Sequence, residues 1–212
     1  MPDMHLLAAF VAATLVLTLS PGPSNLYIMA CTLNNGPRAG INAALGMAIG
    51  SCIYVMLSAV GMSALVLHHP EVFVTIQVCG AVYLLYLGAV TLHGASASSH
   101  AVASIPSKRH LIRESLTVEL TNPKTILFFI AFLPQFTHMG SLNISLQFAL
   151  LGMLYTVLAF GSDILMVAMT SWFGKMINAK TSLRYWQEIL AGSVLCILGI
   201  TLIGQEIIAL IK

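Results

Sequence analysis

A helix-breaking tetrapeptide, Ser20-Pro21-Gly22-Pro23, lies inside a long apolar stretch near the start of the chain. Met4 to Pro37 contains no Asp, Glu, Lys or Arg. About 20 helical residues cross the ~30 Å hydrocarbon core of a bilayer, so this stretch is long enough to span one. Proline removes a backbone N–H and clashes with the preceding turn, and glycine adds backbone freedom. Because freed backbone groups find no water in lipid, such a break is tolerated only against protein or beside a wet cavity. The tetrapeptide therefore predicts a functional site, and a kink that only shapes packing is the alternative.

The composition agrees with a polytopic membrane protein. The chain is 58% hydrophobic and 8% charged over 212 residues, whereas soluble domains carry about 25% charged residues. A net charge of +2 without a basic stripe excludes nucleic acid as a partner. The four cysteines are scattered through apolar runs, which is typical of small buried hydrophobic residues. We expect one transmembrane domain covering residues 1–212, with no cofactor.

Hydropathy and turn signals predict an all-α membrane protein with six transmembrane helices. They group into two inverted three-helix repeats, at about 1–93 and about 113–212, joined by an Ala/Ser/His-rich linker at about 94–112. The first and fourth helices are broken at proline motifs. The expected spans are 4–32, 39–67, 72–93, 113–135, 146–172 and 188–210.

Basic residues predict the orientation of these spans. Seven of the nine lie in or beside the odd-numbered loops: Arg38, Lys108, Arg109, Arg113, Lys175, Lys180 and Arg184. The even-numbered loops have no Lys or Arg, and of the two remaining lysines only Lys212, at the end of the chain, disagrees. By the positive-inside rule the odd loops face the cytoplasm and both termini lie outside it.

The second break, Leu120-Thr121-Asn122-Pro123-Lys124, lies at the centre of the fourth span. Asn122 and Pro123 are suited to the N-cap and first position of a half-helix that restarts inside the membrane. Ser20, or Ser24 after Pro23, is expected to cap the half-helix of span one in the same way. Two such positive helix ends facing each other would hold an anion such as a carboxylate.

Three ionisable residues lie away from the span ends: Glu119, Lys124 and Asp163. A charge in the hydrocarbon region costs at least ~2.5–3.5 kcal/mol, so these side chains should face the interior and pair. Lys124 with Asp163 is the preferred pair, Lys124 with Glu119 is the alternative, and a purely structural ion pair stays open. Glu119 could instead reach toward the interface.

Small residues on the second span form a face for close helix packing. Gly46 and Gly50 make a Gly-x-x-x-Gly pattern, flanked by Gly40 and Ala43. We interpret this face as a packing surface.

Several motifs together resemble the LysE/RhtB family of bacterial amino-acid exporters over nearly the whole chain. They are Leu19-Ser20-Pro21-Gly22-Pro23, the segment 33–40, Leu120-Thr121-Asn122-Pro123-Lys124, Phe132-Leu133-Pro134-Gln135-Phe136, and Asp163 in span five. The resemblance implies efflux of small amino acids or derivatives (homoserine, its lactone, threonine, leucine or cysteine) across the bacterial inner membrane. It also implies that proton entry drives efflux.

The candidate residues for substrate binding or coupling are Ser20, Pro21, Gly22, Pro23, Asn25, Glu119, Asn122, Pro123, Lys124 and Asp163. The expected partners are an amino-acid substrate, protons and lipid, and a homo-oligomer is compatible with the sequence. A metal-ion exporter of the same architecture is the rival, although the interior has few carboxylates and a lysine that would repel cations. An intramembrane enzyme is a weaker rival, since Gly61-Met62-Ser63-Ala64 has no interior His to activate its serine.

Overall fold

The computed structural model describes residues 4–20, 22–94, 110–137 and 143–177, and short pieces of 189–204. These residues form helices, and no strand occurs among them, as expected for an all-α membrane protein. Three described helices are long and apolar enough to cross a membrane, and the number rises to five if each of two bent helix pairs counts as one span. The sixth predicted span lies mostly outside the described residues, as does the predicted linker.

The helices lie where the sequence predicted apolar spans. In chain order they are α1 (Met4–Leu19), α2 (Pro23–Asn35), α3 (Pro37–Leu57), the π-helix η1 (Ser58–Met62), α4 (Ser63–His68), α5 (Pro70–Gly94), α6 (Leu111–Leu120), α7 (Pro123–Leu127), the π-helix η2 (Phe128–Phe132), the 3-10 helix η3 (Leu133–Phe136) and α8 (Ile144–Ile177). Proline occupies the first turn of α2, α3 and α7, where its missing N–H costs nothing.

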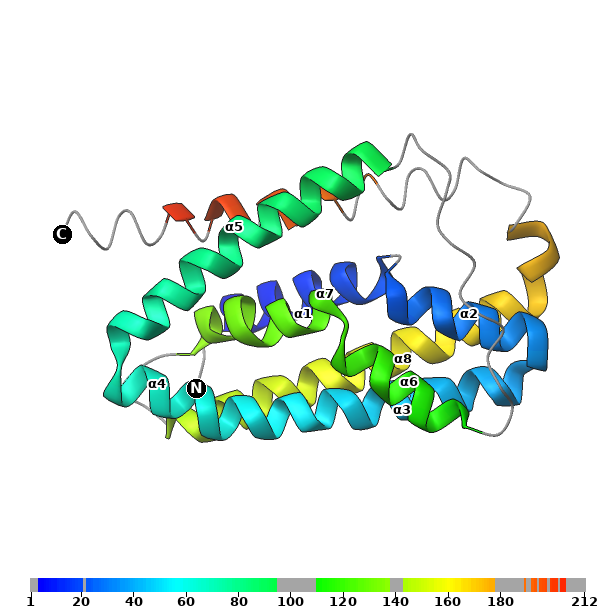
Figure 1. Ribbon diagram of the computed structural model, residues 1–212, viewed down its shortest axis with the longest axis horizontal. Coiled ribbons are helices and arrows are strands. Elements are labelled where there is room, and N and C mark those ends of the chain that lie inside the picture. Colours follow the sequence, from blue (N-terminus) through cyan, green and yellow to red (C-terminus); the bar gives the residue numbers. More distant parts are fainter. Residues whose placement is uncertain are drawn as a thin grey trace.

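Both proline motifs coincide with a bend between two helices. α1 and α2 meet at 51°, and α6 meets the segment that begins with α7 at 50°. The step between α6 and α7 is visible near the centre of Figure 1. Each bent pair has the composition of a single broken span, but a re-entrant loop has the same local geometry. The six-span inverted repeat therefore stays a prediction.

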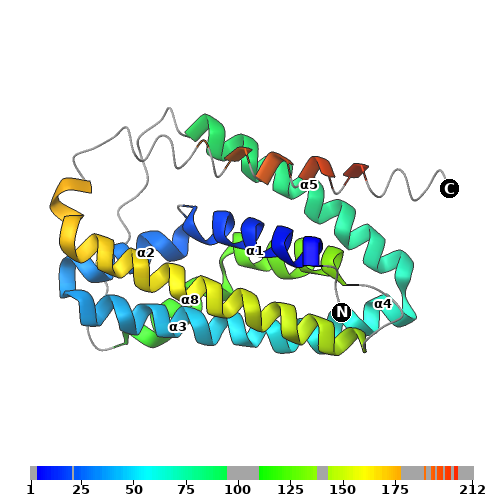
Figure 2. The same ribbon diagram turned by 180° about the vertical axis from the view of Figure 1, so that it is seen from behind.

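α3 and α8 are the two long supports of the bundle. They pack side by side in both views, and α6 packs against α3 (Figures 1 and 2). α5 crosses the bundle obliquely and contacts η2. In this arrangement α6 lies against α3 and also contacts α2 and α7, the helices that follow the two bends.

The glycine face of α3 makes the contact with α6 unusually close. A Cβ on Gly46 would lie 2.5 Å from the carbonyl oxygen of Ile112 and even closer to the hydroxyl of Ser115. A Cβ on Gly50 would lie 2.9 Å from Cγ of Glu119. The predicted packing role of this face is confirmed, and its partner is the helix that carries Glu119.

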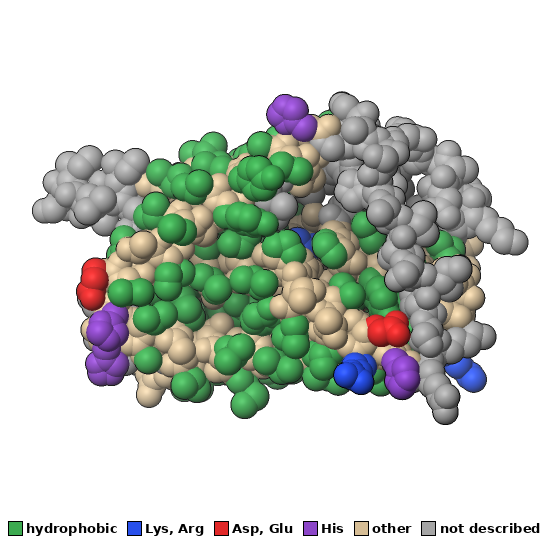
Figure 3. All heavy atoms as spheres, viewed as in Figure 1, with side chains coloured by type: hydrophobic (Ala, Val, Ile, Leu, Met, Phe, Trp, Pro, Cys, Tyr) green, Lys and Arg blue, Asp and Glu red, His purple; other side chains and the backbone are tan. Residues whose placement is uncertain are grey.

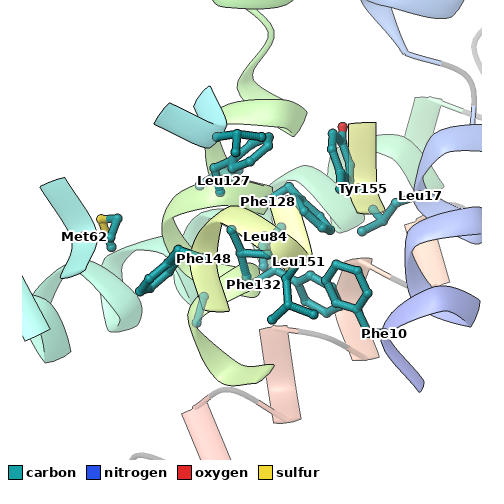
Figure 4. Packing of buried hydrophobic residues seen from close by; sticks show 14 of the residues in the cluster. Phe10, Leu17, Met62, Leu84, Leu127, Phe128, Phe132, Phe148, Leu151 and Tyr155 are labelled. Carbon is teal, nitrogen blue, oxygen red and sulfur yellow. The ribbon is translucent and has the colours of Figure 1, made fainter. Parts of the chain in front are cut away.

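An aromatic cluster fills the interior between α1, η2, η3 and α8. Phe128 stacks on Tyr155 of α8 with ring centroids 4.0 Å apart (Figure 4). Phe10 of α1 packs edge-on against Phe136, with ring centroids 5.2 Å apart. Phe10, Phe129 and Phe132 are each at most 1% exposed. These rings fix α1, η2 and α8 against one another, so the breaks are held by rigid packing rather than by loops.

The face of the molecule in Figure 3 is largely apolar across its middle. Hydrophobic side chains cover most of the face in Figure 3, and most visible charged and His side chains lie at the two ends of that face. This distribution fits a molecule whose midsection is surrounded by lipid. Cys31 is buried as predicted, but Cys79 is exposed on α5, so its predicted burial is wrong.

Candidate functional site at the two helix breaks

The two breaks touch each other through polar side chains. Asn122 Nδ2 donates to Ser24 Oγ over 2.7 Å, which joins the first residues of α7 to the first turn of α2. Asn122 is the N-cap of α7, since its Oδ1 accepts from the backbone N–H of Lys124 over 3.0 Å. The predicted Asn122 cap is therefore confirmed. The predicted serine cap on α2 is wrong, because Gly22 is the N-cap there and no side chain caps the helix.

Lys124 binds the backbone at the end of α1. Its Nζ donates to the carbonyl oxygens of Leu17 and Ser20, each over 3.0 Å. In the described part of the chain it forms no ion pair within 4.0 Å with Asp163 or Glu119, so both predicted pairings are wrong. The physical reason is the break itself. The last carbonyls of α1 have no helical N–H to bind, and an ammonium satisfies them while complementing the negative end of the helix.

Asn25 completes the support of the same carbonyls. Its Nδ2 donates to the carbonyl oxygens of Thr18 and Ser20, each over 2.9 Å. Asn25 is 5% exposed and belongs to the first turn of α2. The Asn25 amide and the Lys124 ammonium thus satisfy the carbonyl oxygens at the end of α1 inside the protein.

Glu119 is the centre of the polar network. Its carboxylate accepts from three hydroxyl groups, those of Ser24 (2.6 Å), Ser51 (3.1 Å) and Thr125 (3.0 Å). Glu119 is 4% exposed, so the alternative in which it reaches toward the interface is wrong. The three donors come from α2, α3 and α7. The carboxylate therefore ties α6 to three other helices and lies against the first turns of both half-helices, where negative charge is favoured.

Asp163 is buried without such support. It lies on α8 with 8% of its surface exposed. Within the described residues it has no hydrogen bond and no ion pair within 4.0 Å. Its neighbour Ser162 bonds Thr18 of α1 over 2.9 Å, which fixes this turn of α8 beside the first break. Asp163 is therefore a carboxylate free to bind a cationic group.

A cavity joins these groups. It offers about 20 Å³ to water-sized molecules, room for about one or two waters. Its lining includes three ionisable side chains, Glu119, Lys124 and Asp163, and several apolar ones. Its lining consists of Thr18, Ser24, Asn25, Ala48, Ser51, Glu119, Asn122, Lys124, Thr125, Tyr155, Ala159, Phe160 and Asp163.

Most of the predicted site residues come together here. Asn25, Glu119, Asn122, Lys124 and Asp163 line the cavity. Two more lie beside Lys124. The carbonyl oxygen of Ser20 accepts from Lys124 and Asn25, and a Cβ on Gly22 would lie 3.1 Å from Lys124 Nζ. Pro23 and Pro123 begin α2 and α7 and do not line the cavity, and Pro21 lies outside the described residues.

Several residues of this site are not among the predicted site residues. Ser51 and Thr125 donate to Glu119, and Ala48, Ala159 and Phe160 contribute apolar side chains to the lining. Thr125 carried a usable signal, since it occupies the third position of a helix whose cap was predicted. Ser51 directly follows Gly50, on the face that packs against Glu119.

Comparison with known proteins identifies the family. The model of the LysE type translocator family matches residues 15–206, which include both breaks and Asp163. The chain belongs to this family. No solved structure matches it.

This LysE type translocator is similar to curated proteins from several bacteria. It is 32% identical to a leucine efflux protein of Enterobacter sp. (strain 638) over 154 residues, covering 71% of this chain and 72% of that protein. It is 27% identical to a leucine efflux protein of Klebsiella pneumoniae over 87% of this chain and 88% of that protein. It is 28% identical to the uncharacterized membrane protein YrhP of Bacillus subtilis over 93% of this chain and 98% of that protein.

Proposed function

We propose that this translocator exports amino acids or close derivatives from the cytoplasm by proton antiport. The candidate substrates are homoserine, homoserine lactone, threonine, leucine and cysteine. Two similar curated proteins are named leucine efflux proteins. The observation that carries the proposal is that Asp163 lines the same cavity as Lys124 and has no hydrogen-bond or ion-pair partner among the described residues.

The cavity has a place for each charged end of an amino acid. An ammonium has three N–H donors, and Lys124 uses two of them on carbonyl oxygens. The third is available for a substrate carboxylate beside the positive ends of α2 and α7. The substrate ammonium then pairs with Asp163. An apolar side chain would lie against Ala48, Ala159 and Phe160.

The cavity is too small for a substrate in this conformation. Small-molecule sites usually have volumes of ~300–1,000 Å³, whereas this cavity offers about 20 Å³. Binding therefore requires the helices around Glu119 to separate, as alternating access demands. We expect the cavity to open first toward the cytoplasm, which the odd-numbered loops face, with both termini on the other side of the inner membrane.

Proton coupling follows from the charges of the interior. Two carboxyl groups, Glu119 and Asp163, line the cavity with one amino group, Lys124, so with all three ionised the lining carries one excess negative charge. A proton or the substrate ammonium can neutralise Asp163, but not both at once. Competition between them for one carboxylate is sufficient for antiport.

The test is transport by Asp163→Asn in proteoliposomes. We expect the variant to lose pH-driven uphill efflux, since its amide can neither take up a proton nor pair with an ammonium. Glu114→Gln is the matched control, because Glu114 accepts from Tyr27 over 2.9 Å and does not line the cavity. Substrates are assayed as a panel of the amino acids above and divalent metal ions. Full pH-driven efflux by Asp163→Asn would overturn this coupling role, and transport of metals alone would overturn the substrate class.

A further inference from the structure

The carbonyl end of α1 has the features of a cation site. The carbonyl oxygens of Leu17 and Ser20 converge on one point, the position of Lys124 Nζ, at 3.0 Å each. These groups carry the negative end of the α1 dipole, and a helix end inside a membrane protein cannot turn to water. In membrane carriers, unwound carbonyls and half-helix C-terminal ends are typical ligands of sodium ions.

The ammonium that fills this point comes from a distant part of the chain. Lys124 belongs to α7, 104 residues away from Ser20 in sequence. Its Nζ also lies so close to Gly22 that a Cβ there would be 3.1 Å away. The absence of a side chain at Gly22 thus lets the ammonium approach the broken backbone.

We propose that the end of α1 is a monovalent-cation site that the Lys124 ammonium occupies permanently as a tethered cation. Removing the Lys124 side chain opens the site to sodium. In the wild-type protein the tethered ammonium makes the carrier independent of sodium. This last consequence rests on the proposed function, whereas the cation site itself does not.

The charges around the site favour the same exchange. Glu119 and Asp163 line the cavity that Lys124 lines. Without Lys124 the cavity lining has no positive side chain beside these two carboxylates among the described residues, and uncompensated charge in the membrane interior is costly. A small cation bound by the carbonyl oxygens of Leu17 and Ser20 would replace the positive charge that the variant lacks beside these carboxylates.

The experiment compares Lys124→Ala with Lys124→Met. Alanine empties the space of the side chain, whereas methionine keeps an unbranched stem that blocks it. The thermal unfolding temperature of each purified protein is measured in detergent, with 150 mM sodium chloride or 150 mM choline chloride. For a sodium Kd of about 10 mM, mass action predicts that sodium raises the unfolding temperature of Lys124→Ala by about 3–6 °C. We expect no difference between the salts for the wild type and for Lys124→Met.

Three results would overturn the proposal: no sodium-specific rise for Lys124→Ala, an equal rise for Lys124→Met, or a sodium requirement of the wild type. If Lys124→Ala proves unstable, its yield of folded protein is compared after extraction in the two salts. A higher yield in sodium supports the site, and equal yields, including none in either salt, refute it.

Wild-type counterflow of each of the five candidate substrates, leucine among them, in the same two salts separates this proposal from the proposed function. A wild type that transports no amino acid, beside a sodium-stabilised Lys124→Ala, would refute the function and leave the site. Sodium-independent leucine transport without stabilisation of Lys124→Ala would refute the site and leave the function.

Discussion

Replacing Glu119 with alanine tests the polar network most directly. The substitution removes an acceptor of three hydrogen bonds from Ser24, Ser51 and Thr125 and leaves three buried hydroxyl groups behind. Hydrogen bonds to a charged group contribute about 1.5–3 kcal/mol each. Removing the carboxylate also relieves the cost of holding a charge in the membrane interior, about 2.5–3.5 kcal/mol. The balance is a loss of about 2–5 kcal/mol in the free energy of unfolding.

The assay is thermal unfolding of the purified protein in detergent. For a chain of this length 1 kcal/mol corresponds to about 2–4 °C, so the unfolding temperature of Glu119→Ala should fall by about 4–20 °C. The unfolding temperature of Glu119→Gln should lie between those of Glu119→Ala and the wild type, because the amide keeps the shape of the side chain and one acceptor oxygen.

Glu114→Ala is the matched control on the same helix. Glu114 accepts one hydrogen bond, from Tyr27, and is only partly buried, so its loss should cost about 1 kcal/mol or less. If Glu119→Ala unfolds at the same temperature as Glu114→Ala, the carboxylate of Glu119 does not join the four helices and the network is wrong.

Three further predictions concern packing, the second break and orientation. Gly46→Ala should lower the unfolding temperature by several degrees, because its Cβ would lie 2.5 Å from the Ile112 carbonyl oxygen and overpacking costs about 1–3 kcal/mol. Gly161→Ala, whose Cβ would have nothing within 4 Å, should leave the unfolding temperature unchanged, and equal behaviour of the two variants would contradict the close α3–α6 contact. Pro123→Ala should leave an inserted, folded protein with impaired substrate efflux, since an alanine lets α6 continue into α7 and weakens the half-helix end; normal efflux would place the site elsewhere. A reporter active only outside the cytoplasm should be active when fused after Lys212, and a cytoplasm-only reporter should be silent; the opposite pattern would refute the topology and the inverted repeat.

The sequence predicted the elements well because their signals are local. The helix restart at Pro123, its Asn122 cap and the glycine face at Gly46 each depend on residues within one or two turns. Burial in lipid also penalises any mistake in apolar pattern, so the helices α3, α5 and α8 coincide closely with the expected spans.

The partners of the charged residues could not be predicted in the same way. Sequence gives the depth of Lys124 and Asp163 along their helices but not the rotation of one helix against another. It also hides backbone acceptors. The carbonyls of Leu17 and Ser20 become available only because α1 ends there, and they replaced the expected carboxylate. The donors to Glu119 come from three helices, and no spacing rule links them.

The small size of the cavity bears on ion leakage across the membrane. A hydrated ion carries more water than the one or two molecules that this space admits. In this conformation the contacts of Glu119 with its three hydroxyl partners leave no room for a hydrated ion between the two breaks. A resting copy of the protein should pass no leak current, and the membrane potential should be independent of how many idle copies the membrane holds.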